Sequence, residues 1–234
     1  GIDPANDMIR EIVYDDTEIP GQSSGSLHHK PQYGYFYNEN RAATVNSGSS
    51  VTNNCHFFAA SGSSVAPLEN GQGSHIGYAA VTTLSGTGGS NGKTVSEFTS
   101  YQDFQDGHFG YPYGPVTSQD YKRGLLTKRT TYSASGIKVN QELHEYKYPT
   151  AHFKTIRGQI VGFFLRSINF PNDPIANVLS LRTYEVNIEW MYKSKQTHRQ
   201  FDENGTDFAE TVTHYDYDNP AHTQLTKTTT FDSH

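Results

Sequence analysis

The sequence predicts an all-β protein made of antiparallel sheets built from β-hairpins, with little helix. Aromatic residues make up 13% of the 234 residues, with 16 Tyr and 13 Phe. Ser, Thr, Asn and 21 Gly separate these rings, and this mixture is typical of strands joined by tight turns. A hairpin-like internal repeat recurs in the second half of the chain. These observations leave open whether the sheets stack as a sandwich or form one open sheet.

Composition excludes several classes of protein. Hydrophobic residues reach only 34%, charged residues 18%, and the formal net charge is −6. Disordered chains are rich in charge and poor in aromatics, so we expect an ordered fold in which Tyr and Phe rings replace aliphatic core. The negative charge and the lack of a basic stripe argue against a nucleic-acid partner. The longest apolar run, 160–165, is far shorter than a membrane span of about 20 residues.

The chain divides into a loop-rich β region, 1–120, and a hairpin-repeat β region, 121–234, which we expect to be continuous in one β-rich unit. In the first region, strand-like segments alternate with polar Ser/Gly/Asn stretches that are typical of surface loops. The expected strands are 9–14, 33–37, 76–83 and 94–101, and the expected loops include 47–54 and 85–92.

The second region carries a clearer alternation of apolar and polar residues. Ile137, Val139 and Leu143 occupy alternate positions of one segment. A second alternation places the apolar Val186, Ile188, Trp190 and Tyr192 between the polar Glu185, Asn187, Glu189 and Lys193. A period of two marks a half-buried strand, since successive side chains point to opposite faces. The segment 156–170 is more continuously apolar, which indicates either a strand buried on both faces or a short helix.

The internal repeat has the form of a β-hairpin. The motif consists of an aromatic residue, three turn-forming residues and a glycine, followed by a Tyr-x-Tyr pair. It occurs twice, and each position of the second copy lies 69 residues after its counterpart in the first, as residue 201 does after residue 132. Glycine supplies the positive φ of a tight turn, and the paired tyrosines share one face of the returning strand. The repeat positions are Tyr132, Gly136, Tyr146 and Tyr148 in the first copy and Phe201, Gly205, Tyr215 and Tyr217 in the second.

A third copy begins near the end of the sequence. Residues 227–231 match 128–132, and the sequence stops at His234 before the glycine of that copy. We therefore interpret the sequence, which begins at Gly1, as an excised segment of a larger protein. Its last strand would lack a hairpin partner, so we expect that strand to fray or to pair with a neighbouring molecule.

These hairpins resemble YD repeats, the tyrosine- and aspartate-marked units of the Rhs family of bacterial surface and secreted proteins. The similarity is carried by Tyr-Asp-Tyr-Asp at 215–218 and by the run 124–136. Segments 73–78, 98–103 and 123–126 are similar, in the same order, to uncharacterised YD-repeat-like proteins of Bacteroidetes. The resemblance implies an extracellular or cell-surface scaffold without catalytic residues in this segment, whose partners include flanking domains of the same chain.

The best candidate for ligand binding is the aromatic loop 101–113. Planar rings beside carboxylates can stack on a sugar while accepting hydrogen bonds from its hydroxyls. The alternative is that the rings fold down and cover a sheet. The candidate residues are Tyr101, Asp103, Phe104, Asp106, His108, Tyr111 and Tyr113.

Other motifs favour ordinary structural roles. Residues 21–25 fit Gly-x-Ser-x-Gly, but a nucleophile elbow needs a following helix, and no helical pattern follows. Asp216 and Asp218 have a spacing compatible with glycosidase carboxylates, although they open a turn. His75 is the first choice for a metal ligand, yet no His spacing matches a known site. We therefore expect no cofactor, no metal and no enzyme activity.

The expected function is a non-catalytic structural or interaction scaffold. A carbohydrate-binding module that uses the loop 101–113 is the second hypothesis, with a glycan or another protein as partner. A glycosidase-type hydrolase is the third.

Overall fold

The computed structural model describes residues 9–19, 21–28, 30–44, 50–65, 75–107, 114–150, 153–163, 179–219 and 221–233. Every strand pairing in these ranges is antiparallel, so the predicted fold class is confirmed. The helical elements described over their whole length are two short 3₁₀ turns, η2 (Thr87–Gly89) and η3 (Asp120–Lys122). Within the same ranges, no helix is long and apolar enough to cross a membrane.

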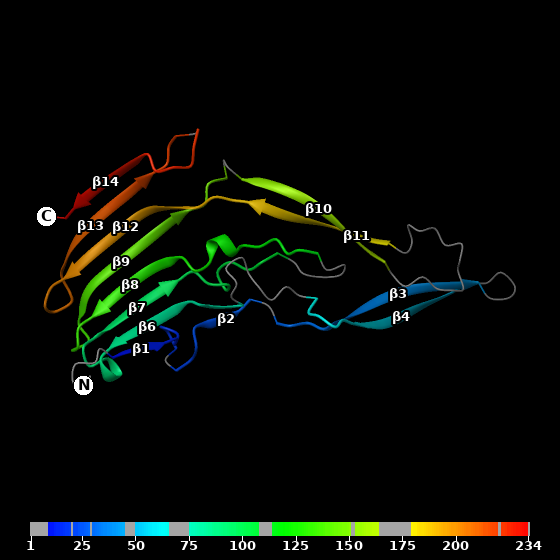
Figure 1. Ribbon diagram of the computed structural model, residues 1–234, viewed down its shortest axis with the longest axis horizontal. Coiled ribbons are helices and arrows are strands. Elements are labelled where there is room, and N and C mark those ends of the chain that lie inside the picture. Colours follow the sequence, from blue (N-terminus) through cyan, green and yellow to red (C-terminus); the bar gives the residue numbers. More distant parts are fainter. Residues whose placement is uncertain are drawn as a thin grey trace, which may run out of the picture.

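The largest sheet has eight strands that lie side by side between the two ends of the chain (Figure 1). From β6 to β9, and again from β12 to β14, each strand pairs with the next in sequence. The order across the sheet is β1 (Arg10–Val13), β6 (Ala80–Ser85), β7 (Lys93–Phe98), β8 (Leu126–Tyr132), β9 (Lys138–Lys147), β12 (Tyr192–Phe201), β13 (Phe208–Asp216) and β14 (Lys227–Asp232). The sheet is open rather than closed, with β1 and β14 at its edges, and it takes strands from both regions of the sequence.

Three smaller sheets have two strands each. β2 (Gly25–Leu27) pairs with β5 (Ile76–Tyr78), β3 (Gly34–Thr44) with β4 (Ser50–Ala60), and β10 (Lys154–Phe163) with β11 (Leu179–Ile188). The long ribbons β3–β4 and β10–β11 extend away from the eight-stranded sheet on the same side of the molecule (Figure 1).

Several predicted boundaries are wrong. The predicted loop 47–54 overlaps β4, which begins at Ser50, and the predicted strand 76–83 is divided at Ala79 into β5 and β6. The alternation over 186–192 spans two strands, since β11 ends at Ile188 and β12 begins at Tyr192. Alternation reports which face a side chain occupies and carries no information about the partner strand. The chain therefore passes from the ribbon into the large sheet without a change in pattern.

The segment 156–170 forms strand in its described part, but that strand is not buried on both faces. Ile156 is 58% exposed and Val161 48% exposed. A two-stranded ribbon has no second layer to cover it, so side chains on both of its faces meet solvent.

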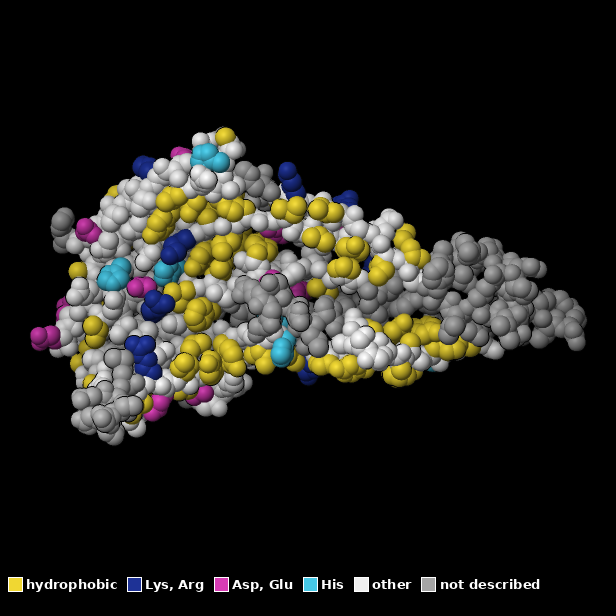
Figure 2. Space-filling model, in the orientation of Figure 1, with side chains coloured by type: hydrophobic (Ala, Val, Ile, Leu, Met, Phe, Trp, Pro, Cys, Tyr) yellow, Lys and Arg dark blue, Asp and Glu magenta, His cyan; other side chains and the backbone are white. Residues whose placement is uncertain are grey.

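The expectation that aromatic rings replace an aliphatic core is wrong for the described residues. Ala80 is the one buried hydrophobic residue among them, and Phe36 is 80% exposed. Figure 2 shows hydrophobic side chains at the surface along both ribbons and in bands across the sheet. The buried residues are instead mainly polar, including Thr130, Gln141 and Thr197 on the adjacent strands β8, β9 and β12. Cross-strand pairing therefore holds this layer together more than a hydrophobic interior does.

The two repeat hairpins are confirmed. Gly136 (φ 79°) and Gly205 (φ 71°) occupy the left-handed region in the turns β8–β9 and β12–β13. Gly136 N–H donates to the carbonyl of Ser133, and Gly205 N–H donates to that of Asp202. Tyr132 and Phe201 end the first strands of the two hairpins. Tyr146 and Tyr215 lie in the returning strands, and Tyr148 and Tyr217 follow one residue after the strands end.

Strand β14 is ordered and covered on one side. It pairs with β13 from Lys227 opposite Asp216 to Asp232 opposite Thr211. The expectation of a frayed or intermolecularly paired last strand is therefore wrong on that side, because β13 supplies a ladder partner. The other side of β14 is an edge of the sheet. Strand β14 joins β13 in the same antiparallel manner in which β12 joins β9.

Candidate functional site

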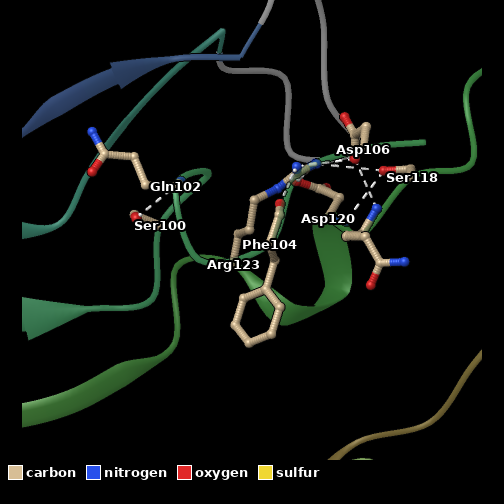
Figure 3. Close-up of polar contacts among 8 residues, drawn as sticks. Ser100, Gln102, Phe104, Asp106, Ser118, Asp120 and Arg123 are labelled. Carbon is tan, nitrogen blue, oxygen red and sulfur yellow. Dashed lines mark hydrogen bonds and ion pairs between the residues drawn. The ribbon is translucent and has the colours of Figure 1, made fainter. Parts of the chain in front are cut away.

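The predicted aromatic loop is built around a buried arginine. Arg123 follows η3 and is 4% exposed. Its Nη1 lies 3.0 Å from Asp106 Oδ1 and donates to the carbonyl of Phe104, also at 3.0 Å. Its Nη2 lies 3.4 Å from Asp120 Oδ1 (Figure 3). This guanidinium ties the chain that enters the loop, through Phe104 and Asp106, to the chain that leaves it.

The two predicted sugar-binding carboxylates are engaged within the loop. Asp103 accepts hydrogen bonds from Ser100 N–H (2.7 Å) and Ser100 Oγ (2.9 Å). Asp106 accepts from Gln119 N–H at 2.7 Å in addition to its ion pair with Arg123, and its side chain is 5% exposed. Both carboxylates thus satisfy the loop's own donors and hold its backbone in place.

The described rings of the loop fold down onto the protein. The Tyr101 ring lies 5.1 Å from the ring of His28, and the Arg123 guanidinium lies 5.1 Å from the Tyr101 centroid. The Phe104 ring lies 6.0 Å from that of Tyr148. Tyr101, Asp103, Phe104 and Asp106 are therefore brought together as a packed unit. His108, Tyr111 and Tyr113 lie outside the described residues.

The tyrosines of the first repeat copy belong to the same packed unit. The Tyr148 ring meets Tyr121 edge-on at 6.2 Å, and Lys122 Nζ lies 5.4 Å from the Tyr148 centroid. Burial raises the pKa of Tyr148, and the neighbouring Tyr146 raises it further. Burial also raises the pKa of Tyr146, whose hydroxyl donates to the carbonyl of Leu126 at 2.9 Å. Both rings act as structural side chains.

The tyrosines of the second copy lie beside an open cavity. The Tyr217 ring lies 4.2 Å from that of Tyr192 and meets Trp190 edge-on at 5.6 Å. Together with charged residues from the ends of β9, β12 and β13, Tyr192 and Tyr217 line a cavity of about 540 Å³. The sequence pattern does not predict this site, because the alternation of apolar residues places Trp190 and Tyr192 in one continuous strand. The available signal was the only tryptophan of the chain beside a recurring Tyr-x-Tyr pair.

The remaining predicted motifs have local roles. Ser23 of the Gly-x-Ser-x-Gly segment forms an isolated bridge with Asp15, and strand β2 follows it in place of a helix. The carbonyl of His75, the first choice for a metal ligand, accepts a hydrogen bond from His28 N–H. Asp218 accepts from Thr226 Oγ1, which lowers the pKa of the Asp218 carboxyl. In the part of the chain that the structure describes, no three His, Cys, Asp or Glu side chains gather as a metal site.

The fold and the sites define an open, single-layer β-sheet protein built from hairpin repeats. No protein-family model, curated protein or solved structure matches this chain. The resemblance to YD repeats therefore rests on the sequence motifs.

Proposed function

We propose that this chain is a non-catalytic structural and interaction scaffold of a secreted or cell-surface YD-repeat-like protein. The observation that carries this proposal is the lateral addition of repeat hairpins to one sheet. Hairpin β8–β9 lies directly beside β12–β13 through the β9–β12 ladder, although the ribbon β10–β11 separates the two in sequence. A sheet that grows by adding equivalent hairpins is an extensible scaffold.

The surface of the sheet supports a role in contacts with other domains. Its buried residues are mainly polar, and large apolar side chains remain exposed on both ribbons. On the ribbon β10–β11, the neighbours Ile156 and Val186 are 58% and 46% exposed. Exposed apolar surface on an ordered element favours contact with a protein partner. Flanking domains of the same chain fit that partner best, because such a contact would form during folding.

The geometry offers less support for the alternatives at the predicted loop. Asp103 and Asp106 are satisfied by backbone and arginine donors, which leaves little acceptor capacity for a sugar or for acid–base chemistry. This arrangement favours a structural role for the described part of the loop.

The proposed location and role can be tested in the source cells. Protease treatment of intact cells, combined with fractionation and an antibody to this segment, should find it at the surface or in the medium. Cross-linking followed by mass spectrometry should connect the ribbons β3–β4 and β10–β11 to flanking regions of the same polypeptide. A purely cytosolic protein would overturn the location. Turnover of glycosides or esters by the purified chain would overturn the non-catalytic role.

A further inference from the structure

The cavity beside the second repeat copy has an aromatic wall. Tyr192, at the start of β12, and Tyr217, just after β13, have ring centroids 4.2 Å apart and planes inclined at 38°. The Trp190 ring contacts both, with centroids 4.9 Å from Tyr192 and 5.6 Å from Tyr217. Because Trp190 supports the two tyrosines, a ring-shaped ligand would meet a preformed wall.

The charged groups around this wall fall into two sets. Glu145 and Lys195 neutralise each other at 2.9 Å, and Asp218 accepts from the Thr226 hydroxyl. Lys147 and Asp216 line the same cavity, and no described residue forms a hydrogen bond or an ion pair with either of their side chains. Asp218 keeps its charge, since its hydrogen-bond partner is a neutral hydroxyl. The lining therefore carries two cations, Lys147 and Lys195, and three anions, Glu145, Asp216 and Asp218, which leaves a slight excess of negative charge.

This combination matches the chemistry of a neutral sugar. The C–H face of a pyranose packs against an aromatic ring, while its hydroxyls donate to a carboxylate and accept from an ammonium group. Hydrogen bonds to charged groups are the stronger kind. The volume of about 540 Å³ lies within the range of roughly 300–1,000 Å³ for small-molecule sites. An anionic ligand would meet the excess negative charge of Asp216 and Asp218, so the lining disfavours an acidic sugar.

We propose that the groove formed by Tyr192, Tyr217, Lys147 and Asp216 binds a neutral oligosaccharide. The site is distinct from the loop 101–113, and it lies at the junction of the two repeat hairpins. The proposal goes beyond the scaffold function and does not depend on it, since a sugar site can exist on this sheet wherever the protein resides.

The single tryptophan of the chain makes the test direct. Trp190 contacts both wall tyrosines, so ligand entry should change its fluorescence. The intact chain is titrated with maltohexaose, cellohexaose, xylohexaose and mannohexaose up to about 10 mM, because one shallow site gives modest affinity. Calorimetry is run in parallel. We expect saturable binding of at least one of these probes.

Variants then locate the binding. Tyr217→Ala should weaken affinity at least about tenfold, which corresponds to about 1.4 kcal/mol. Asp216→Asn, which keeps the shape of the side chain, should weaken it by about five- to tenfold through loss of a charge-assisted hydrogen bond. Tyr217→Phe keeps the ring and should bind within about threefold of the unmodified chain. Phe36→Ala is the matched control, since it removes an 80% exposed aromatic ring from a distant ribbon and should leave affinity unchanged.

Several results would overturn the proposal. The first is that neither method detects saturable binding of any of the four probes. The second is that Tyr217→Ala and Asp216→Asn both bind as tightly as the unmodified chain. The third is that Phe36→Ala loses as much affinity as Tyr217→Ala. Binding of polygalacturonate with no binding of the neutral probes would equally exclude a neutral sugar as the ligand.

Discussion

The two copies of the hairpin repeat share a backbone but use their second tyrosine differently. In the first copy, Tyr148 packs against Phe104 and Tyr121 beneath the cation of Lys122. In the second, Tyr217 stacks on Tyr192 and lines an open cavity. The difference comes from neighbouring segments, because the Arg123-centred loop covers the first copy and no described loop covers the second in the same way. The position in the repeat therefore determines where the tyrosine ring lies. Whether a neighbouring loop covers that ring determines whether it packs inside the protein or can contact a ligand.

The two turns also differ in their surroundings. A Cβ added to Gly136 would meet nothing within 4 Å, whereas one added to Gly205 would lie 2.8 Å from Ile137 Cγ2. Ile137 immediately precedes β9, so the second turn packs against the first hairpin. Both turns need a residue that adopts positive φ. The turn at Gly205 also needs a residue without a side chain, because a Cβ there would overlap Ile137.

The largest expected effect on the free energy of unfolding comes from disrupting the Arg123-centred loop that packs over the first copy. Arg123→Ala leaves the buried Asp106 carboxylate without its cation, and breaking a buried pair in this way costs about 3–5 kcal/mol. Arg157→Ala is the control, since its 77% exposed side chain pairs with Glu185 on a ribbon and should change stability by no more than about 1 kcal/mol. Urea unfolding of both variants measures the difference. Equal, small effects would mean that the loop does not hold the first copy in place.

The next largest effect separates the two turns. Gly205→Ala combines a left-handed residue with the overlap at Ile137 and should destabilise the chain by roughly 3 kcal/mol. Gly136→Ala meets only the conformational cost, about 1–2 kcal/mol. Thermal and urea unfolding of the two variants give the comparison. Equal losses would show that the second turn does not pack against the first hairpin.

A smaller effect tests whether the first tyrosines of the two copies are equivalent. The Tyr146 hydroxyl donates to the Leu126 carbonyl at 2.9 Å, and the Tyr215 hydroxyl donates to Gln196 Oε1 at 3.2 Å. Tyr146→Phe and Tyr215→Phe should each cost about 1 kcal/mol, the net value of one hydrogen bond. A loss in only one of these variants would extend the difference between the copies to this position.

The smallest effect is a pH dependence that His144 of the first copy introduces below pH 6.5. His144 in β9 corresponds to Thr213 in the second copy. Burial lowers the pKa of His144 below 6.5, Lys193 and Arg129 lower it further, and Glu142 acts in the opposite direction. The folded state therefore resists a proton that the unfolded chain accepts near pH 6.5, so stability should fall as pH drops from 6.5 towards the folded pKa and then level off.

His144→Thr, the residue of the second copy, should remove this acid-side slope. The measurement is the free energy of unfolding in urea between about pH 7.5 and 5, compared as slopes because the substitution also changes packing. An unchanged slope would assign the acid sensitivity to other groups.

The features that depend on neighbouring residues could be predicted from the amino-acid sequence. Tight turns need a residue with positive φ, so the recurring glycines at 136 and 205 located both hairpins. Alternation at Val139 and Leu143 located β9, because side-chain direction along a strand has a period of two. The all-β class follows from the same local preferences.

Contacts between distant segments could not be predicted from the sequence and are seen only in the fold. The ladder between β9 and β12 bypasses an inserted ribbon, Arg123 reaches Asp106 across a loop, and Trp190 meets Tyr217 across two strands. The prediction of an aromatic core is wrong for the same reason. Rings are buried only when a second layer covers the sheet, and the described strands of the large sheet form a single layer. Contacts between distant segments depend on how the whole chain closes. For that reason both the packing of the predicted loop and the position of the saccharide groove became visible only in the folded molecule.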